Sequence, residues 1–241
     1  PLLLVGAHGT GKSLLLTRIS EALDLQFRHY NSSLLNFDDL VGFPLPTAGG
    51  SLEYIKTPAA IWGAEAVIFD EISRCRPDMQ NKLFPIVHER RVQGILLEEL
   101  RYRWAAMNPP VSDEDDGGYV GSEPLDPALA DRFAFVIAMP GWEQFDEEEQ
   151  TALIRGDNGT VGAEAADRLR RAIGSVRAAL PAVAKSIGEP VSIYTRTVVA
   201  LLAQSGLPLS PRRASMLHRS ILAVHAVSAS LSLDMKPAEA T

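Results

Sequence analysis

Hydrophobic and polar residues follow two patterns along residues 1–140. Short unbroken apolar runs at 2–5 and 66–69 are typical of strands buried on both faces of a sheet. Residues 13–25 instead place apolar side chains three or four positions apart, which predicts an amphipathic helix. The same criteria predict further strands at 25–30, 103–107 and 133–139 and a second helix at 77–89. Strands that alternate with helices indicate a parallel sheet with helices on both faces.

The pattern changes after Pro140. The strands stop, and helix-like stretches follow at 163–184, 191–205 and 211–231, with predicted breaks at 188–190 and 206–208, where glycine and proline occur. The charge changes at the same place, because residues 1–140 carry 12 basic and 19 acidic side chains whereas residues 141–241 carry 11 of each. We therefore expect two domains, an α/β domain over 1–140 and a small all-helical domain over 141–241.

Composition narrows the functional classes. The 241 residues have a formal net charge of −7, which argues against nucleic acid as a partner. No apolar run approaches the ~20 residues of a membrane span, so we expect no membrane span. The single cysteine, Cys75, excludes an intrachain disulfide and fits a reducing, cytoplasmic location.

A glycine-rich loop follows the first predicted strand. Residues 6–13 match the phosphate-binding pattern G-x-x-x-x-G-K-[ST] in full, with a buried strand before the loop and an amphipathic helix after it. Glycines let backbone N–H groups turn toward a polyphosphate, and the start of the helix adds its positive end. We expect Lys12 to reach the phosphates and Ser13 to bind Mg²⁺. The predicted nucleotide-binding residues are Gly6, Ala7, His8, Gly9, Thr10, Gly11, Lys12, Ser13 and Leu14.

Two carboxylates follow the strand at 66–69. Asp70 is placed to hold Mg²⁺ together with Ser13, and Glu71 is placed to act as the general base for water that attacks the γ-phosphate. Asn108 closes the fourth predicted strand. Because strand ends of a parallel sheet face the ligand crevice, we expect the Asn108 amide to orient that water.

These segments together resemble the AAA+ ATPases, most closely their MoxR-like and dynein- and midasin-related branch. The stretch 70–74 (D-E-I-S-R) is similar to that group's D-E-I-N-R, with Ser73 in place of the usual asparagine, and 37–42 resembles its D-L-[IV]-G segment. Residues 125–133 (L-D-P-A-L-A-D-R-F) resemble the motif that carries the arginine finger. The resemblance implies that Arg132 acts in trans on the ATP of a neighbouring subunit. It also implies that Arg212, in 210–212 (S-P-R), is the sensor 2 arginine.

The resemblance implies a P-loop sheet of order 5-1-4-3-2 followed by a helical lid. It further implies an ATPase that works with Mg²⁺ as a homo-oligomeric, hexameric ring. Such rings remodel or activate proteins as chaperones, often with a partner that carries a von Willebrand A domain, and client contacts would lie on inserts around 41–54 and 92–102.

Two other classes stay open at this stage. One is an ATPase motor or subunit that acts on nucleic acid, which would use the arginines at 90, 91, 101 and 103. The other is a P-loop phosphotransferase, although a kinase of that type does not need the Asp70–Glu71 pair. A module that binds nucleotide without hydrolysing it fits only if Glu71 has no catalytic role.

Overall fold

The computed structural model describes residues 1–47, 49–50, 52–109, 125–155 and 160–234. Contacts divide the chain into two compact units, Pro1–Val161 and Gly162–Thr241. This division falls about twenty residues after the boundary predicted at 140/141, because the segment with η2 (Trp142–Gln144) and α5 (Glu147–Ile154) belongs to the first unit. Both elements of that segment have exposed or half-buried side chains throughout.

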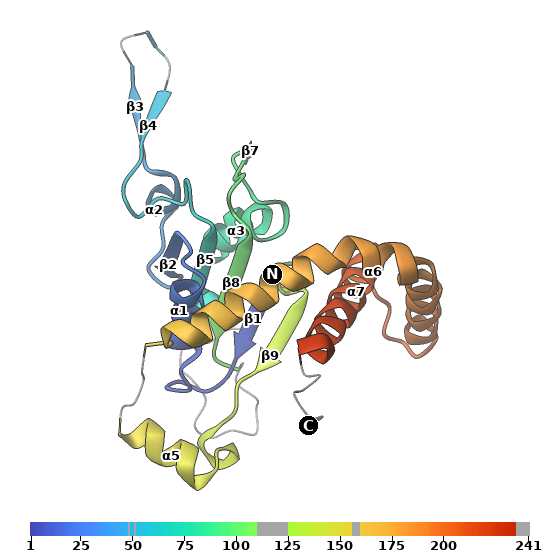
Figure 1. The fold of residues 1–241 in the computed structure, drawn as a ribbon. Helices are drawn as coiled ribbons and strands as arrows, with labels where there is room; N and C mark the ends of the chain where they lie inside the picture. The colour runs from blue at the N-terminus through green and yellow to red at the C-terminus, as the bar shows by residue number, and fades with distance from the viewer. Residues whose placement is uncertain (48, 51, 110–124, 156–159, 235–241) are drawn as a thin grey trace. The chain divides into compact units, whose positions relative to one another are not determined.

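The first unit is built on a five-stranded parallel sheet. Its strands are β1 (Leu2–Val5), β2 (Phe27–Asn31), β5 (Ala66–Asp70), β8 (Tyr102–Met107) and β9 (Phe135–Ala138), paired in the order β2-β5-β8-β1-β9. Read as the first to fifth core strands, this is the expected order 5-1-4-3-2 (Figure 1). The predicted α/β fold is therefore confirmed, and the strand that precedes the glycine-rich loop lies inside the sheet.

Helices cover both faces of this sheet. On one face α1 (Lys12–Ala22) packs Leu16 against Leu4 and Ile68. On the other face lie α2 (Phe37–Val41), η1 (Ile72–Arg74), α3 (Pro77–Glu89) and α4 (Pro127–Ala130). The largest core cluster forms there, with Leu83 of α3 fully buried against strand residues such as Phe69. Helix α3 runs through Pro85 as one element, over the range that the apolar spacing predicts.

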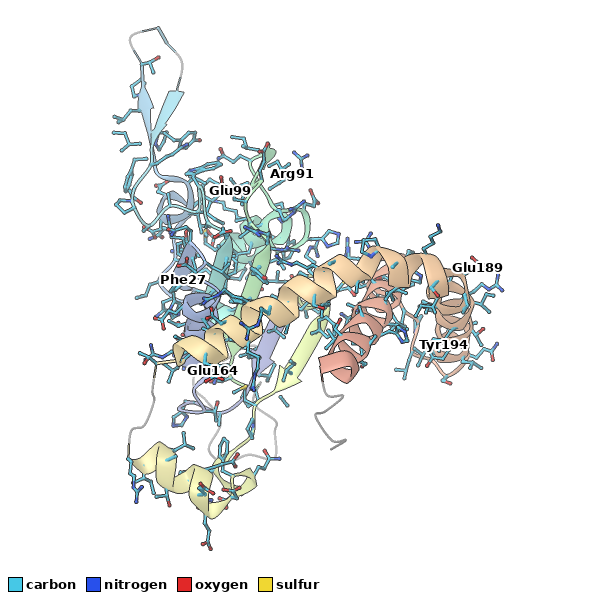
Figure 2. All side chains as sticks on the ribbon, in the orientation of Figure 1. Phe27, Arg91, Glu99, Glu164, Glu189 and Tyr194 are labelled. Carbon is cyan, nitrogen blue, oxygen red and sulfur yellow. The ribbon has the colours of Figure 1, made fainter. Side chains whose placement is uncertain are left out.

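Two hairpins interrupt the alternation of strands and helices. The strands β3 (Phe43–Pro46) and β4 (Leu52–Ile55) extend away from the sheet beyond α2 (Figure 1), and β6 (Arg91–Val92) pairs with β7 (Ile95–Leu96). Figure 2 labels Arg91, at the start of β6. A hydrogen bond of 3.1 Å from the Tyr54 hydroxyl to Gln93 Oε1 joins the two hairpins. They coincide with the inserts expected around 41–54 and 92–102.

Over the described residues 162–234, the second unit is formed by two helices. The prediction of a break at 188–190 is wrong, because α6 (Ala163–Gln204) continues through Pro181 and Pro190 before α7 (Pro211–Asp234) begins. Figure 2 shows that α6 bends where Glu189 is labelled. At the bend the Ser192 hydroxyl donates to the Gly188 carbonyl of the same helix (2.9 Å), and His218 Nε2 of α7 lies 3.2 Å from that hydroxyl. Proline thus bends this helix without ending it.

Candidate active site

The glycine-rich loop joins β1 to α1 and has a backbone that glycine favours. Gly9 and Gly11 have φ values of 76° and 74°, in the left-handed region. At Gly6 the limit is space, since an added Cβ would lie 2.8 Å from the Cβ of Met139. Gly11 caps α1 without a side-chain hydrogen bond, so the first N–H groups of the helix remain for a ligand. The loop therefore has the form of an anion-binding site.

Lys12 lies at the centre of this loop and is 8% exposed. Its ammonium group donates to the carbonyl oxygens of Gly6 (2.8 Å) and Ala7 (2.7 Å) and to Oδ1 of Asn108 (3.2 Å). Burial lowers the pKa of Lys12, while the carboxylates of Asp70 and Glu71 oppose this change. Lys12 is thus a desolvated cation held by carbonyl oxygens, which a polyphosphate can replace with a stronger, charge-assisted interaction.

The side chains of Ser13 and Asp70 meet beside Lys12. The Ser13 hydroxyl donates to Oδ2 of Asp70 at 2.6 Å, although 57 residues separate them in the sequence. Burial alone would raise the pKa of Asp70, but hydrogen bonds from His29, Ser13 and the Glu71 N–H lower it below its ordinary value. A hydroxyl next to an ionised carboxylate is a hard oxygen pair of the kind that binds Mg²⁺ along with phosphate oxygens and water. The donor set therefore fits the expected metal.

Glu71 follows directly on the end of β5. Its backbone is left-handed (φ 51°, ψ 41°), which is uncommon for a residue other than glycine. Its carboxylate lies 3.6 Å from the guanidinium of Arg74, and its N–H donates to Oδ1 of Asp70 (3.0 Å). Glu71 lines the same pocket as Lys12, so a carboxylate that can accept a proton is present beside the phosphate loop.

One pocket of about 250 Å³ collects most of the predicted residues. Its lining comes from the loop and from the carboxyl ends of β5 and β8, where Asn108 follows the last residue of β8. The lining residues are His8, Gly9, Gly11, Lys12, Ser13, Leu14, Asp70, Glu71, Met107 and Asn108. Of the other predicted loop residues, Gly6 and Ala7 accept from Lys12, and the Thr10 hydroxyl donates to the Ala7 carbonyl (2.8 Å) and so braces the loop.

The two predicted arginines belong to other elements of the chain. Arg132 follows α4, donates to the carbonyl of Ala128 and stacks on Phe84, with its guanidinium carbon 4.3 Å from the ring centre. It is not a lining residue of the pocket in the described part of the chain. Arg212 belongs to the second unit, at the start of α7, where the Ser210 hydroxyl caps the helix by accepting from the Arg213 N–H (3.1 Å).

Two residues near the pocket escaped the sequence reasoning. Met107 lines it from the end of β8, and His29 on β2 places Nε2 3.5 Å from Oδ2 of Asp70. Met107 is part of an apolar run, which carries no sign of a ligand. His29 could have been found only from the pairing of β2 with β5, because a lone histidine in a strand has no characteristic spacing to an aspartate 41 residues later.

Comparisons with known proteins agree with this geometry. Over residues 1–133 the chain matches the family of AAA domains of the dynein-related subfamily. Its fold is similar to a crystal structure, at 2.00 Å resolution, of a protein from Cytophaga hutchinsonii that is provisionally named an ATPase. The TM-score is 0.58 at 22% identity, over 95% of this chain and 71% of that one. A comparison with curated proteins finds no match. Since the family match spans more than half of the chain and includes the whole pocket, the chain belongs to the dynein-related subfamily of AAA domains.

Proposed function

We propose that this AAA domain binds and hydrolyses ATP with Mg²⁺ and, as a ring of identical subunits, remodels or activates a protein partner in the manner of the MoxR-like group. The observation that carries the ATPase proposal is the single pocket in which Lys12, Ser13, Asp70, Glu71 and Asn108 meet. A P-loop alone indicates nucleotide binding. A second carboxylate and a strand-end amide beside it add groups suited to hydrolysis.

Each pocket residue has a distinct task in this proposal. Lys12 leaves the loop carbonyls and binds the β- and γ-phosphates. Ser13 and Asp70 hold Mg²⁺, which neutralises phosphate charge when bound. Glu71 accepts a proton from the attacking water, and Asn108 orients that water through its amide. Arg74 lies close enough to Glu71 to orient its carboxylate.

The trans role proposed for Arg132 is supported by its position. Arg132 rests on Phe84 of its own chain, away from the residues that line its own pocket. An arginine of this kind would serve a neighbouring subunit, and the active site would then be complete only in an oligomer. The sensor 2 role of Arg212, at the start of α7, is proposed on the same resemblance.

Partner contacts are proposed on the hairpins. Phe43, Leu45 and Ile55 on the β3–β4 hairpin are 53%, 47% and 53% exposed, and Ile95 on β7 is 55% exposed. Exposed apolar side chains grouped on projecting hairpins suit the capture of another protein. We propose a homo-oligomer, expected to be hexameric, with a partner that carries a von Willebrand A domain, in a cytoplasmic setting. Within the described residues no helix is long and apolar enough to span a membrane.

Three of the four arginines that would favour nucleic acid, those at 91, 101 and 103, are engaged within the chain. Arg101 pairs with Glu65, and Arg91 donates to the Gly94 carbonyl (2.5 Å). Arg103 is half-buried and donates to the carbonyls of Val87 (3.1 Å) and Arg101 (2.7 Å). A phosphate contact would have to compete with these interactions, so we favour a protein partner.

The proposal is tested by ATP turnover as a function of protein concentration. We expect specific activity to rise with concentration, because each site needs its neighbour. Glu71→Gln and Arg132→Ala should lose about 10²-fold or more of the activity while retaining ATP binding. Glu89→Gln and Arg171→Ala, at exposed positions, are the matched controls. The shared site would be refuted if specific activity did not change with protein concentration and Arg132→Ala hydrolysed ATP as fast as the wild type. Turnover that depends on added DNA, RNA or a phosphate acceptor would instead support one of the other two classes.

A further inference from the structure

Groups from three different places in the chain surround the Asp70 carboxylate. The Ser13 hydroxyl of α1 donates to Oδ2, the Glu71 N–H after β5 donates to Oδ1, and Nε2 of His29 on β2 lies 3.5 Å from Oδ2. Ser13 and Asp70 belong to the proposed magnesium site. His29 has no place in the P-loop pattern or in the reaction described above, and its contact therefore needs an explanation of its own.

The strand register explains how His29 reaches this carboxylate. His29 on β2 is the register partner of Ile68 on β5, and Asp70 follows Ile68 by two residues. Side chains alternate along a strand, so His29, Ile68 and Asp70 share one face of the sheet. Ile68 packs with Leu16 of α1 on that face. The imidazole thus reaches past its direct partner to the next side chain on the same face.

The carboxylate is more buried than the imidazole that reaches it. The Asp70 side chain is 24% exposed and so has lost part of its hydration, whereas the His29 side chain is 37% exposed. A carboxylate that loses water needs fixed donors to hold its charge and its orientation. Ser13 is itself a proposed metal ligand, so its hydroxyl oxygen must also face the metal. His29 and the Glu71 N–H are then the donors to Asp70 that have no other task in the site.

We propose that His29 is a positioning residue that orients the Asp70 carboxylate for Mg²⁺ in the nucleotide complex. This inference rests on the proposed function, since it presumes that Asp70 binds the metal. Outer donors to a ligating carboxylate commonly change metal affinity by about 10–100-fold. His29 should therefore affect how tightly Mg²⁺ binds with nucleotide and leave the affinity for nucleotide alone unchanged.

The test measures Mg²⁺ affinity separately from nucleotide affinity. A fluorescent ADP analogue is bound to the full chain in EDTA, and Mg²⁺ is then titrated. We expect His29→Leu to need about tenfold more Mg²⁺ for half-saturation. His29→Gln, whose amide nitrogen reaches as far as Nε2, should restore nearly normal values. His29→Asn is polar but too short and should resemble His29→Leu, which keeps the test valid if the leucine variant folds poorly. His225→Leu, at an exposed position, is the control.

Three results would overturn the inference. One is the same Mg²⁺ requirement in wild type, His29→Leu and His29→Asn. Another is a loss of nucleotide affinity in EDTA in His29→Leu that is as large as its loss of Mg²⁺ affinity, which would mean that His29 only supports the fold. The third is wild-type protein that binds nucleotide with no response to Mg²⁺, or does not bind nucleotide at all. Because this last failure appears in the wild type, it would identify the proposed function itself as wrong.

Discussion

Gly42 offers a sharp test of how the β3–β4 hairpin is attached. It follows α2 with φ 91° and ψ 179°, a backbone region that is open almost only to glycine. A Cβ added there would lie 2.1 Å from the carbonyl oxygen of Ile55 and 2.9 Å from its carbonyl carbon. Ile55 is the register partner of Phe43, so the collision falls on the first pair of the hairpin. Gly42→Ala must therefore strain its own backbone and also weaken that pair.

The size of the effect follows from these two costs. Backbone strain at such a position costs about 1–3 kcal/mol. Loss of one or two hairpin hydrogen bonds adds about 1 kcal/mol each. A total of about 2–5 kcal/mol should lower the Tm of a unit of this size by about 10 °C. Gly50→Ala is the matched control in the same hairpin, because Gly50 has φ 78° but nothing within 4 Å of an added Cβ. Gly50→Ala should therefore cost only the strain of a left-handed backbone, about 1–2 kcal/mol of stability.

Thermal unfolding followed by circular dichroism gives the comparison, and hydrogen exchange at the Phe43 and Ile55 amides locates it. We expect Gly42→Ala to melt well below Gly50→Ala and to exchange faster at the hairpin base. Nucleotide affinity should stay unchanged in both variants, because neither glycine lines the pocket. If the Tm of Gly42→Ala equals that of the wild type, or is no lower than that of Gly50→Ala, the close approach to the Ile55 carbonyl does not constrain the fold and this reasoning is refuted.

Three further predictions concern the core and the site. Burial raises the pKa of the Cys75 thiol to about 11, so iodoacetamide at pH 8 should label it only after unfolding; rapid labelling of the native protein would contradict this. The pKa of Asp70 lies below the ordinary 3.8, because hydrogen bonds outweigh its burial, so its charged form stabilises the fold above that pH. The stability advantage of wild type over Asp70→Asn should then shrink in urea titrations as the pH falls below 3.8, and an unchanged difference would count against it. Leu83→Ala should cost about 2–5 kcal/mol in the same titrations, since Leu83 is fully buried, and a loss below 1 kcal/mol would show that the core collapses around it.

Local patterns predicted most of the α/β unit. The apolar run at 66–69 and the helical spacing at 77–89 are strong sequence signals, because burial in the core determines the residue type at each of these positions. Their pairing order came from the resemblance, since five parallel strands can be ordered in many ways. Lys12, Ser13 and Asp70 were placed together by the rule that strand ends meet at one edge. In the structure all three line one pocket, and Ser13 donates to Asp70.

The parts that were missed depend on distant contacts. Pro190 predicted a helix end, and the continuation of α6 became visible only with Ser192 and His218 across the bend. The approach of His29 to Asp70 follows from a strand register that no local window contains. The β3–β4 hairpin has two prolines among its first four residues, a composition that reads as a loop until its pairing partner is known. The roles of Arg132 and Arg212 stay predictions.

The long sequence separations inside the pocket tie ligand binding to the folding of the whole sheet. Lys12 bonds to Asn108 across 96 residues, and Ser13 bonds to Asp70 across 57. Closing such loops costs chain entropy before the contacts that they bring together can form. We therefore expect these pairs to form late, together with the β1–β8 and β5–β8 pairings. A partly synthesised or nicked chain that lacks β8 would have the complete phosphate loop in its sequence and still lack the pocket. Nucleotide would thus bind only to chains that have finished folding, and by mass action it would protect those chains from proteolysis.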